Sequence, residues 1–302
     1  MAETIAKPRE DRVGLGIAMM LLAWFFFAFV DTSVKWLVIA GLPALQLAFM
    51  RYFGHVILST LMIARSGAGS MRRPRKHLGL VVLRALLLVS ATFSNFVALR
   101  YLSLTLTSSI MFSSPIIVSA LSVPLLGERV GPWRWFAIIL GFAGVLVVVR
   151  PFGADFHWAS TLAIYNALAL ALFSIITRRL SGEVSAETMQ FYLGVIGVVV
   201  LLPGAIWVWQ TPQNALEWAL LISIGFWGWI GHEFFARAHG FAEANALMPF
   251  TYTFLIYLTL SSFVVFGDLP DNFTILGAIL IVASGLLIWW REKHRNLDNV
   301  RT

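Results

Sequence analysis

The segment TLTSSIMFSSPIIVSALS, residues 105–122, places polar, small and aromatic residues inside an otherwise apolar stretch. Polar groups on an apolar helix are costly in lipid unless they face protein or a water-filled path. The residues that break the apolar character are spaced alternately by three and four positions, so they share one face of a helix. They are Thr105, Ser108, Phe112, Pro115, Ser119 and Ser122. The segment therefore predicts a membrane helix with one face turned toward a path through the protein.

A second copy of this pattern lies 140 residues further along the chain, in NALMPFTYTFLIYLTLSS, residues 245–262. The matching positions there are Asn245, Met248, Tyr252, Leu255, Thr259 and Ser262. The register also holds beyond the segment, because Gly127-Glu128 returns as Gly267-Asp268. We therefore interpret residues 1–150 and 151–302 as two repeats of one unit. The two sets of matched residues are called the first and second stripes below.

The composition is that of a membrane protein. Of the 302 residues, 59% are hydrophobic and 12% are charged, whereas soluble domains carry about 25% charged residues. The chain has no cysteine, which excludes a disulfide framework, a thiolate nucleophile and a cysteine metal site. The net charge of +7 comes from short basic segments between apolar runs. We attribute this charge to retention on one membrane face rather than to nucleic-acid binding.

Apolar runs of about 20 residues, the length that crosses a bilayer, predict ten spans with short connections. Because each half holds an odd number of spans, the second repeat is inverted relative to the first. The expected fold is an all-α integral membrane protein with ten transmembrane helices in two inverted five-helix repeats. The spans are expected at Val13–Val38, Pro43–Ala64, His77–Leu99, Ser103–Leu126, Pro132–Val149, Phe156–Thr177, Ala186–Gln210, Leu216–Ala236, Ala242–Phe266 and Asn272–Trp290.

Lysine and arginine are distributed unevenly between the two membrane faces. With the N-terminus in the cytoplasm, the inner segments hold seventeen of the 22 basic residues, and the outer loops hold only Arg100 and Arg150. Basic segments remain on the cytoplasmic side of a membrane. We therefore predict that both termini are cytoplasmic, on the same side as the long polar segment Arg65–Lys76.

The residues around the stripes form a wider pattern. The first half carries Ala98-Leu99-Arg100-Tyr101, Pro115, Leu126-Gly127-Glu128-Arg129, Ala137, Gly141, Gly144 and Arg150, and the second half repeats it more loosely with Ala238, Phe241, Gly267-Asp268, Gly277 and Gly285. This pattern resembles the EamA repeat of the drug/metabolite transporter superfamily over the whole chain. Within the superfamily the chain is similar to the YddG-type aromatic amino-acid exporters. The resemblance implies a central cavity, fifth and tenth helices packed behind it, and export of small metabolites across a bacterial inner (plasma) membrane.

Two prolines are candidates for gating. Pro115 removes a backbone hydrogen bond in mid-span and can kink its helix. In the second repeat Leu255 occupies the matching position, and the proline comes earlier, at Pro249. Any kink there is expected nearer the cytoplasm. A working gate and a static bend both fit this pattern.

Aromatic residues near the centres of spans are candidates for substrate contact. Trp24, Trp227 and Trp229 lie too deep to be explained as anchors at the membrane surface. Phe112 and Tyr252 join them from the two stripes. Such rings can stack on a planar side chain, and a buried indole N–H needs a partner. Plain packing in the core is the alternative for each ring.

Polar residues inside the spans supply a second group of candidates. Ser108, Ser119 and Thr259 belong to the stripes, and Asn95 and Tyr165 lie on other spans. A polar side chain inside a membrane needs a partner, which is either a neighbouring helix or a substrate in the cavity. We expect these groups to serve the carboxylate and amine of a substrate.

Two pairs of opposite charges have i,i+4 helical spacing. We interpret Asp31 and Lys35 as a structural ion pair. Glu233, next to His232, is the candidate for a proton-linked group, because a partly buried carboxylate can titrate near neutral pH. An ion pair from Glu233 to Arg237 at the membrane surface is the alternative.

The remaining charges are assigned structural roles. Arg51 and His55 are interpreted as a peripheral helix contact in the second span. Glu128 and Asp268, at matched loop positions, are expected to cap the helices that follow them. On this interpretation no carboxylate lies at the centre of the cavity, which is expected to be mostly neutral.

The sequence contains no P-loop, no convincing metal-ligand spacing and no nucleophile elbow. We therefore expect neither an enzyme nor a bound cofactor or metal. We predict a secondary transporter that exports amino acids, aromatic ones favoured and the range broad, by alternating access. The alternative is a transporter of another small metabolite, such as a nucleotide sugar, a sugar phosphate or a drug. The expected partners are the substrate and the lipid bilayer, with no nucleic acid; the oligomeric state is left open and a monomer is compatible with the sequence.

Overall fold

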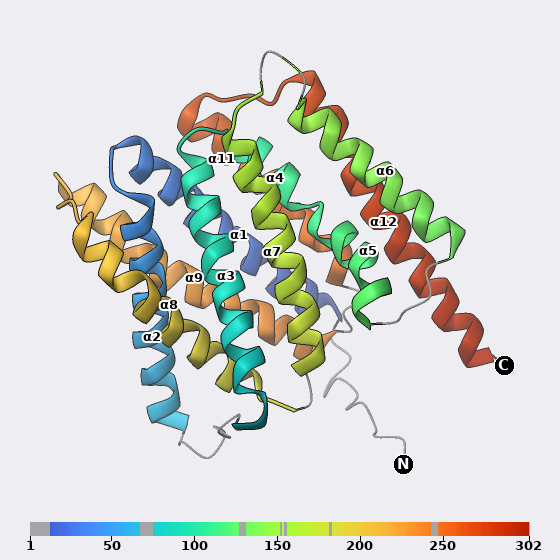
Figure 1. Ribbon diagram of the computed structural model, residues 1–302, viewed down its shortest axis with the longest axis horizontal. Helices are drawn as coiled ribbons and strands as arrows, with labels where there is room; N and C mark the ends of the chain where they lie inside the picture. The colour runs from blue at the N-terminus through green and yellow to red at the C-terminus, as the bar shows by residue number, and fades with distance from the viewer. Residues whose placement is uncertain are drawn as a thin grey trace.

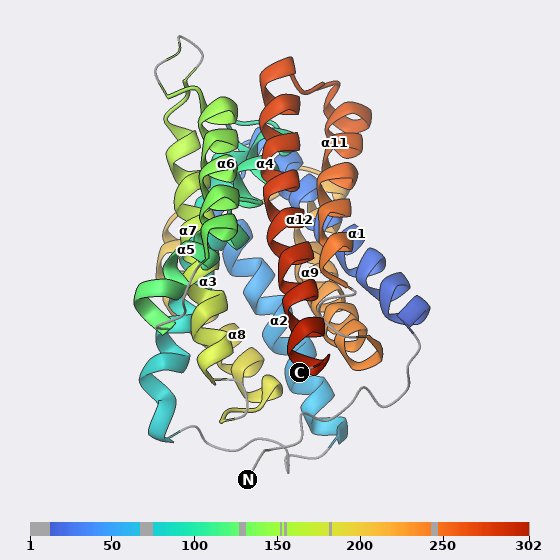
Figure 2. The same cartoon turned by 90° about the vertical axis from the view of Figure 1, so that its right-hand side faces the viewer.

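The computed structural model describes residues 13–66, 75–126, 131–151, 153, 156–180, 183–242 and 247–301. Helices account for most of these residues and stand side by side in one bundle (Figures 1 and 2). The elements are α1 (Val13–Ile39), α2 (Ala44–Ser66), the 3-10 helix η2 (Arg75–His77), α3 (Leu78–Leu99), α4 (Leu104–Met111), α5 (Ser114–Leu126), α6 (Pro132–Val149), α7 (Ala159–Leu180), α8 (Ala186–Trp207), α9 (Ala215–Phe241), the 3-10 helix η3 (Met248–Tyr252), α11 (Thr253–Phe266) and α12 (Asn272–Arg301).

The described elements make ten spans, because α4 and α5 are two parts of one span and η3 and α11 are two parts of another. Among the described residues, eight helical stretches are long and apolar enough to cross a membrane. The other two spans are α2, which contains polar residues such as Arg51 and His55, and α6, whose apolar part Trp135–Val149 is shorter. The prediction of a multi-pass, ten-helix membrane protein is confirmed.

The packing of the helices follows the inverted repeat. The contact of α1 with α9 in one half has its counterpart in the contact of α7 with α3, and α2 on α9 corresponds to α8 on α3. Two further pairs, α2 with α8 and α6 with α12, join a helix to its own equivalent, and the contact of α4 with α11 joins the two broken spans. Figure 2 shows that the beginning of α1 and the end of α12 lie toward the same end of the bundle.

Glycines allow the closest helix contacts. A Cβ atom added at Gly225 on α9 would lie 2.8 Å from the Cα atom of Gly54 on α2. Between α6 and α12, a Cβ atom at Gly144 would lie 2.9 Å from the Gly277 carbonyl oxygen. Small residues let membrane helices approach this closely, and these glycines therefore serve as packing sites.

The two spans that carry the candidate gating prolines are broken where the sequence predicts a kink. α4 ends at Met111, and α5 starts at Ser114 with Pro115 in its first turn, where a missing N–H costs nothing. The hydroxyl of Ser113 donates to the Ile110 carbonyl at 2.7 Å. In the second repeat Pro249 lies in the first turn of η3, before α11 begins.

We expect Gly225→Ala to destabilise the protein by about 1–3 kcal/mol, the usual cost of overpacking. The added methyl group meets backbone atoms of α2, the Gly54 Cα and the Met50 carbonyl, which cannot move aside alone. Thermal unfolding of the purified protein in detergent measures the effect. Gly79→Ala is the matched control, because no atom lies within 4 Å of its added Cβ. Equal melting temperatures for the two variants would show that the close contact of α2 and α9 is not needed.

Candidate functional site

The two stripes meet face to face at the contact of α4 with α11. The Thr105 hydroxyl donates to the Thr259 hydroxyl at 3.3 Å, and the rings of Phe112 and Tyr252 lie 5.2 Å apart. Because Phe112 and Tyr252 are equivalent positions of the two repeats, their contact lies at the boundary between the repeats. Gly285 on α12 makes room for Tyr252, since a Cβ atom there would clash with the tyrosine hydroxyl.

Other stripe residues are buried close to this contact. Ser108 is 2% exposed, and its hydroxyl donates to the Thr105 carbonyl at 3.1 Å. Ser119 on α5 is also buried. Asn245 lies outside the described residues, as do the side chains of Ser122 and Met248.

An aromatic cluster extends from Phe112 and Tyr252 to α1. The ring of Trp24 lies 5.1 Å from Phe254, and Phe112 lies 6.3 Å from Phe254. Within the described part of the chain, the buried Trp24 Nε1 atom has no hydrogen-bond acceptor. Since a buried indole N–H usually finds a partner, this atom is free to serve a ligand. The cluster consists of Trp24, Phe27, Phe112, Phe235, Tyr252 and Phe254.

The other aromatic candidates lie elsewhere. Trp227 on α9 stacks on Phe26 at 5.4 Å and contacts Phe29, which is exposed on the outside of the bundle. Trp229 is two positions further along the helix, so its side chain points away from that of Trp227. Tyr165 is also exposed, and its hydroxyl donates to Ser90 at 2.9 Å.

A layer of polar side chains crosses the bundle beyond the aromatic cluster. Asn95 on α3 donates to the Asp31 carboxylate on α1 at 3.4 and 3.5 Å. It accepts a hydrogen bond from Asn166 on α7 at 3.3 Å. The predicted ion pair between Asp31 and Lys35 is wrong, because Asp31 faces Asn95 and Lys35 is held elsewhere. Asp31 is a carboxylate inside the bundle and not one partner of a local ion pair.

The structure also corrects the assignment of Arg51 and His55. Both lie inside the bundle, where Arg51 sits 5.8 Å from the ring centre of Phe96 and His55 lies 5.9 Å from the ring of His232. Their peripheral assignment is wrong because this face of α2 is covered by α3 and α9. A charged residue in an apolar run is by itself a signal for a functional site, and that signal was available in the sequence.

Glu233 and His232 are neighbours in sequence but are separated in space. Glu233 accepts a hydrogen bond from Arg237 at 2.7 Å, as the i,i+4 spacing predicts. His232 points inward and lies 4.9 Å from the ring of Phe27. The two side chains therefore do not share one site.

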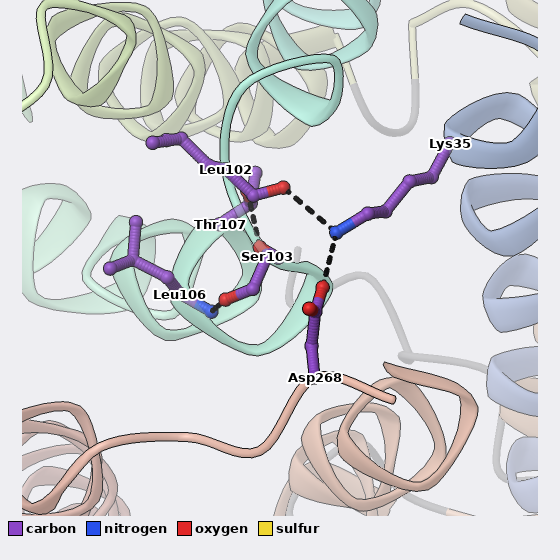
Figure 3. Close-up of polar contacts among 6 residues, drawn as sticks. All are labelled: Lys35, Leu102, Ser103, Leu106, Thr107 and Asp268. Carbon is purple, nitrogen blue, oxygen red and sulfur yellow. Dashed lines mark hydrogen bonds and ion pairs between the residues drawn. The ribbon is translucent and has the colours of Figure 1, made fainter. Parts of the chain in front are cut away.

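Lys35 joins three parts of the chain at one end of the bundle, which we call the Lys35 end. Its ammonium group donates to the Asp268 carboxylate at 2.9 Å and to the Leu102 carbonyl at 3.2 Å (Figure 3). It also lies 4.9 Å from the ring centre of Phe266. We call this group of contacts the Lys35 latch. It ties α1 to the loop before α4 and to the loop after α11.

The latch overturns the expectation that Asp268 caps α12. Asp271 has that role instead, since its carboxylate accepts from the Thr274 amide at 2.8 Å. Gly267, with a φ of 71°, ends α11 in the left-handed region that favours glycine and turns Asp268 toward Lys35. Glu128, the equivalent of Asp268, lies outside the described residues.

The Lys35 end of the bundle is closely packed. There α1, α3 and α4 all contact one another, and the latch adds the loop after α11 to this group.

A groove of about 670 Å³ lies between α11 and α12, on a face of the bundle that exposes Ile256, Leu260 and Ile279. Its lining is almost entirely apolar, with Thr105, Thr259 and Thr274 as its polar members. This groove is therefore separate from the polar layer. No group of three or more His, Asp or Glu residues gathers to hold a metal ion in the part of the chain that the structure describes.

Comparison with known proteins identifies relatives of the whole chain. An S-adenosylmethionine uptake transporter of Rickettsia prowazekii is 29% identical over 90% of this chain and 93% of its own length. A riboflavin transporter of Vibrio cholerae is 29% identical over 94% of this chain and 97% of its own. A pseudopaline exporter of Pseudomonas aeruginosa is 24% identical over 94% and 99%. These relatives include both uptake and export proteins, and their named substrates differ from the amino acids expected from the sequence.

A solved structure shares the fold with a TM-score of 0.62, at 18% identity over 92% of this chain and 96% of that one. The model of the EamA-like transporter family matches residues 14–150 and again residues 157–290. The repeated match agrees with the paired helix contacts, and the family consists of transporters rather than enzymes. The chain therefore belongs to the EamA-like transporter family and is a secondary transporter of small metabolites.

Proposed function

We propose that the protein transports a metabolite that carries a flat aromatic or heteroaromatic ring. The observation that carries this proposal is the aromatic cluster, in which Trp24, Phe112 and Tyr252 come from different spans and both repeats. Aromatic rings in offset or edge-to-face contact contribute about 0.5–1.5 kcal/mol each beyond the area they bury. S-adenosylmethionine and riboflavin, the substrates named for two of the relatives, both contain flat heteroaromatic rings.

Aromatic amino acids belong to the same class of ring-bearing substrates and remain candidates. Sugar phosphates and nucleotide sugars fit less well, because a phosphate needs several basic groups at membrane depth. Lys35 is already held in the latch, and Arg84 donates to the Thr177 hydroxyl at 2.7 Å. Trp227, Trp229 and Tyr165 lie outside the aromatic cluster and are not part of the proposed site.

The proposed mechanism is alternating access by the two repeats, residues 1–150 and 151–302. The latch at the Lys35 end and the paired helix contacts of the two repeats support it. The breaks at Pro115 and Pro249 give each repeat a point at which its broken span can bend. We place the protein in a bacterial inner membrane with both termini in the cytoplasm, because the basic residues favour that orientation.

The substrate class is tested with purified protein in liposomes. We expect uptake of at least one of radiolabelled S-adenosylmethionine, riboflavin and tryptophan, and none of glucose 6-phosphate. Trp24→Ala is expected to weaken the apparent affinity several-fold, since one ring contact contributes about 1 kcal/mol. The matched control is Trp133→Ala, which removes a tryptophan that is 61% exposed on α6. Transport of the sugar phosphate alone would refute the proposal.

Removal of the latch is expected to open the Lys35 end more often. Asp268→Asn leaves Lys35 without its ion-pair partner, and a cysteine at Ser108, now 2% exposed, should then react several-fold faster with a membrane-impermeant thiol reagent. The absence of native cysteines keeps the background low. Asp271→Asn is the matched control, because it changes another aspartate in the same loop. If both variants label Ser108→Cys at the same rate as the parent, the latch does not hold this end closed.

A further inference from the structure

Asp31 and Arg51 carry opposite charges at the same depth inside the bundle. Asp31 lies eight residues before the end of α1 and Arg51 lies seven residues after the start of α2. At about 1.5 Å per residue, both are roughly 10–12 Å from the Lys35 end. Both contact neighbouring residues of α3, since Asp31 accepts from Asn95 and Arg51 lies against the ring of Phe96. No ion pair joins the two within the described residues.

Arg51 differs from the other cations inside the spans. Lys35 is held by the latch, and Arg84 donates to Thr177 at 2.7 Å and to the Met189 carbonyl at 3.3 Å. Arg51 contacts the ring of Phe96, and its guanidinium group makes no hydrogen bond to any described residue. A guanidinium group has five N–H donors in a planar fork. Those of Arg51 are therefore available to an anion.

The Asp31 carboxylate also has only weak hydrogen-bond partners. Its hydrogen bonds from Asn95, at 3.4 and 3.5 Å, are at the long limit for such bonds. Asn95 is fixed in turn by Asn166 of the other repeat. Asp31 and Arg51 are each half-buried, although α3 and α9 pack on both of their helices, so both retain some accessible surface. A carboxylate at this depth with only weak partners is available to a cation.

We propose that Asp31 and Arg51 bind the two charges of an α-amino carboxylate group. The substrate ammonium group binds Asp31, and its carboxylate binds the guanidinium fork of Arg51, a geometry that allows two parallel hydrogen bonds. Phe27 and Trp24 lie one and two turns further along the same face of α1. The head group thus lies in the polar layer while the ring reaches the aromatic cluster.

This inference rests on the proposed function and narrows it. S-adenosylmethionine and tryptophan both carry an α-amino carboxylate group and a flat ring. Riboflavin carries the ring without that group. The substrate is therefore expected to be an amino-acid derivative with an aromatic or heteroaromatic ring. Asp31 and Arg51 both belong to the first repeat, and the hydrogen bond from Asn166 to Asn95 connects their surroundings to the second repeat.

The first test uses the unmodified protein in liposomes, with inhibitors of whichever labelled ring compound it transports. Tryptophan carries both charges, tryptamine lacks the carboxylate, and indole-3-propionate lacks the ammonium group. We expect tryptophan to inhibit at concentrations at least about tenfold lower than either analogue, since each charge-assisted contact is strong. Equal inhibition by all three compounds would overturn the inference.

The second test matches each variant with the analogue that lacks its partner group. Arg51→Gln should weaken inhibition by tryptophan and by indole-3-propionate about tenfold and leave inhibition by tryptamine unchanged. Asp31→Asn should weaken inhibition by tryptophan and by tryptamine and leave inhibition by indole-3-propionate unchanged. Arg150→Gln and Asp271→Asn are the matched controls, because this ion pair joins α6 to α12 away from the polar layer. Melting temperatures in detergent identify any variant that is merely unfolded.

Each outcome separates the two proposals. If either variant weakens inhibition by all three compounds equally, the charge of the replaced residue has a structural role and the head-group assignment is wrong. If Asp31→Asn abolishes only the response to a pH gradient, Asp31 carries a proton and the assignment is also wrong. Transport of riboflavin without inhibition by tryptophan would leave the proposed function standing and overturn this inference alone. Failure to transport any ring compound would overturn the proposed function itself.

Discussion

The structure depends on one constraint, which is that a charge inside the hydrocarbon region must find a partner within the protein or line a polar space. α1 shows both arrangements, at Lys35 and at Asp31, which are four residues apart. Lys35 is satisfied by a carboxylate and a carbonyl from two loops, and those contacts hold one end of the bundle together. Asp31 is satisfied only in part, by an amide on α3. The first arrangement closes a path, and the second leaves a polar group facing it.

The inverted repeat provides the frame in which these charges act. Each major helix contact has a counterpart in the other repeat or joins a helix to its own equivalent, so the two halves can exchange roles when the path opens to the other side. Glycine contacts bring α2 close to α9 and α6 close to α12. The helices near Pro115 and Pro249 are interrupted instead of continuous. On the proposed mechanism, closely packed pairs combined with two broken spans suit a movement of one half against the other.

The proposed site explains how one family can serve chemically different metabolites. Rings are accepted by stacking and apolar contact, which tolerate many shapes. Charged head groups require placed partners, and in this chain those are a single carboxylate and a single guanidinium group that do not pair with each other. Similarity to transporters of S-adenosylmethionine and riboflavin agrees with the proposal that the substrate carries a flat ring. The charged residues then distinguish between these substrates in a way that overall similarity does not.

The sequence by itself determined the ten spans, the inverted repeat and the helix breaks at the two prolines. These features follow from the length of apolar runs, from a repeat of fixed offset and from local backbone chemistry. The sequence also indicated Trp24, Phe112, Tyr252 and Asn95 through their depth. Only the tertiary structure decided which charges pair. Asp31 and Lys35 have the spacing of an ion pair on one helix, yet Lys35 reaches a loop 233 positions away and Arg51 faces inward rather than lipid. Helical spacing fixes which side chains share a face of one helix, whereas the partner of a buried charge depends on which other helices cover that face.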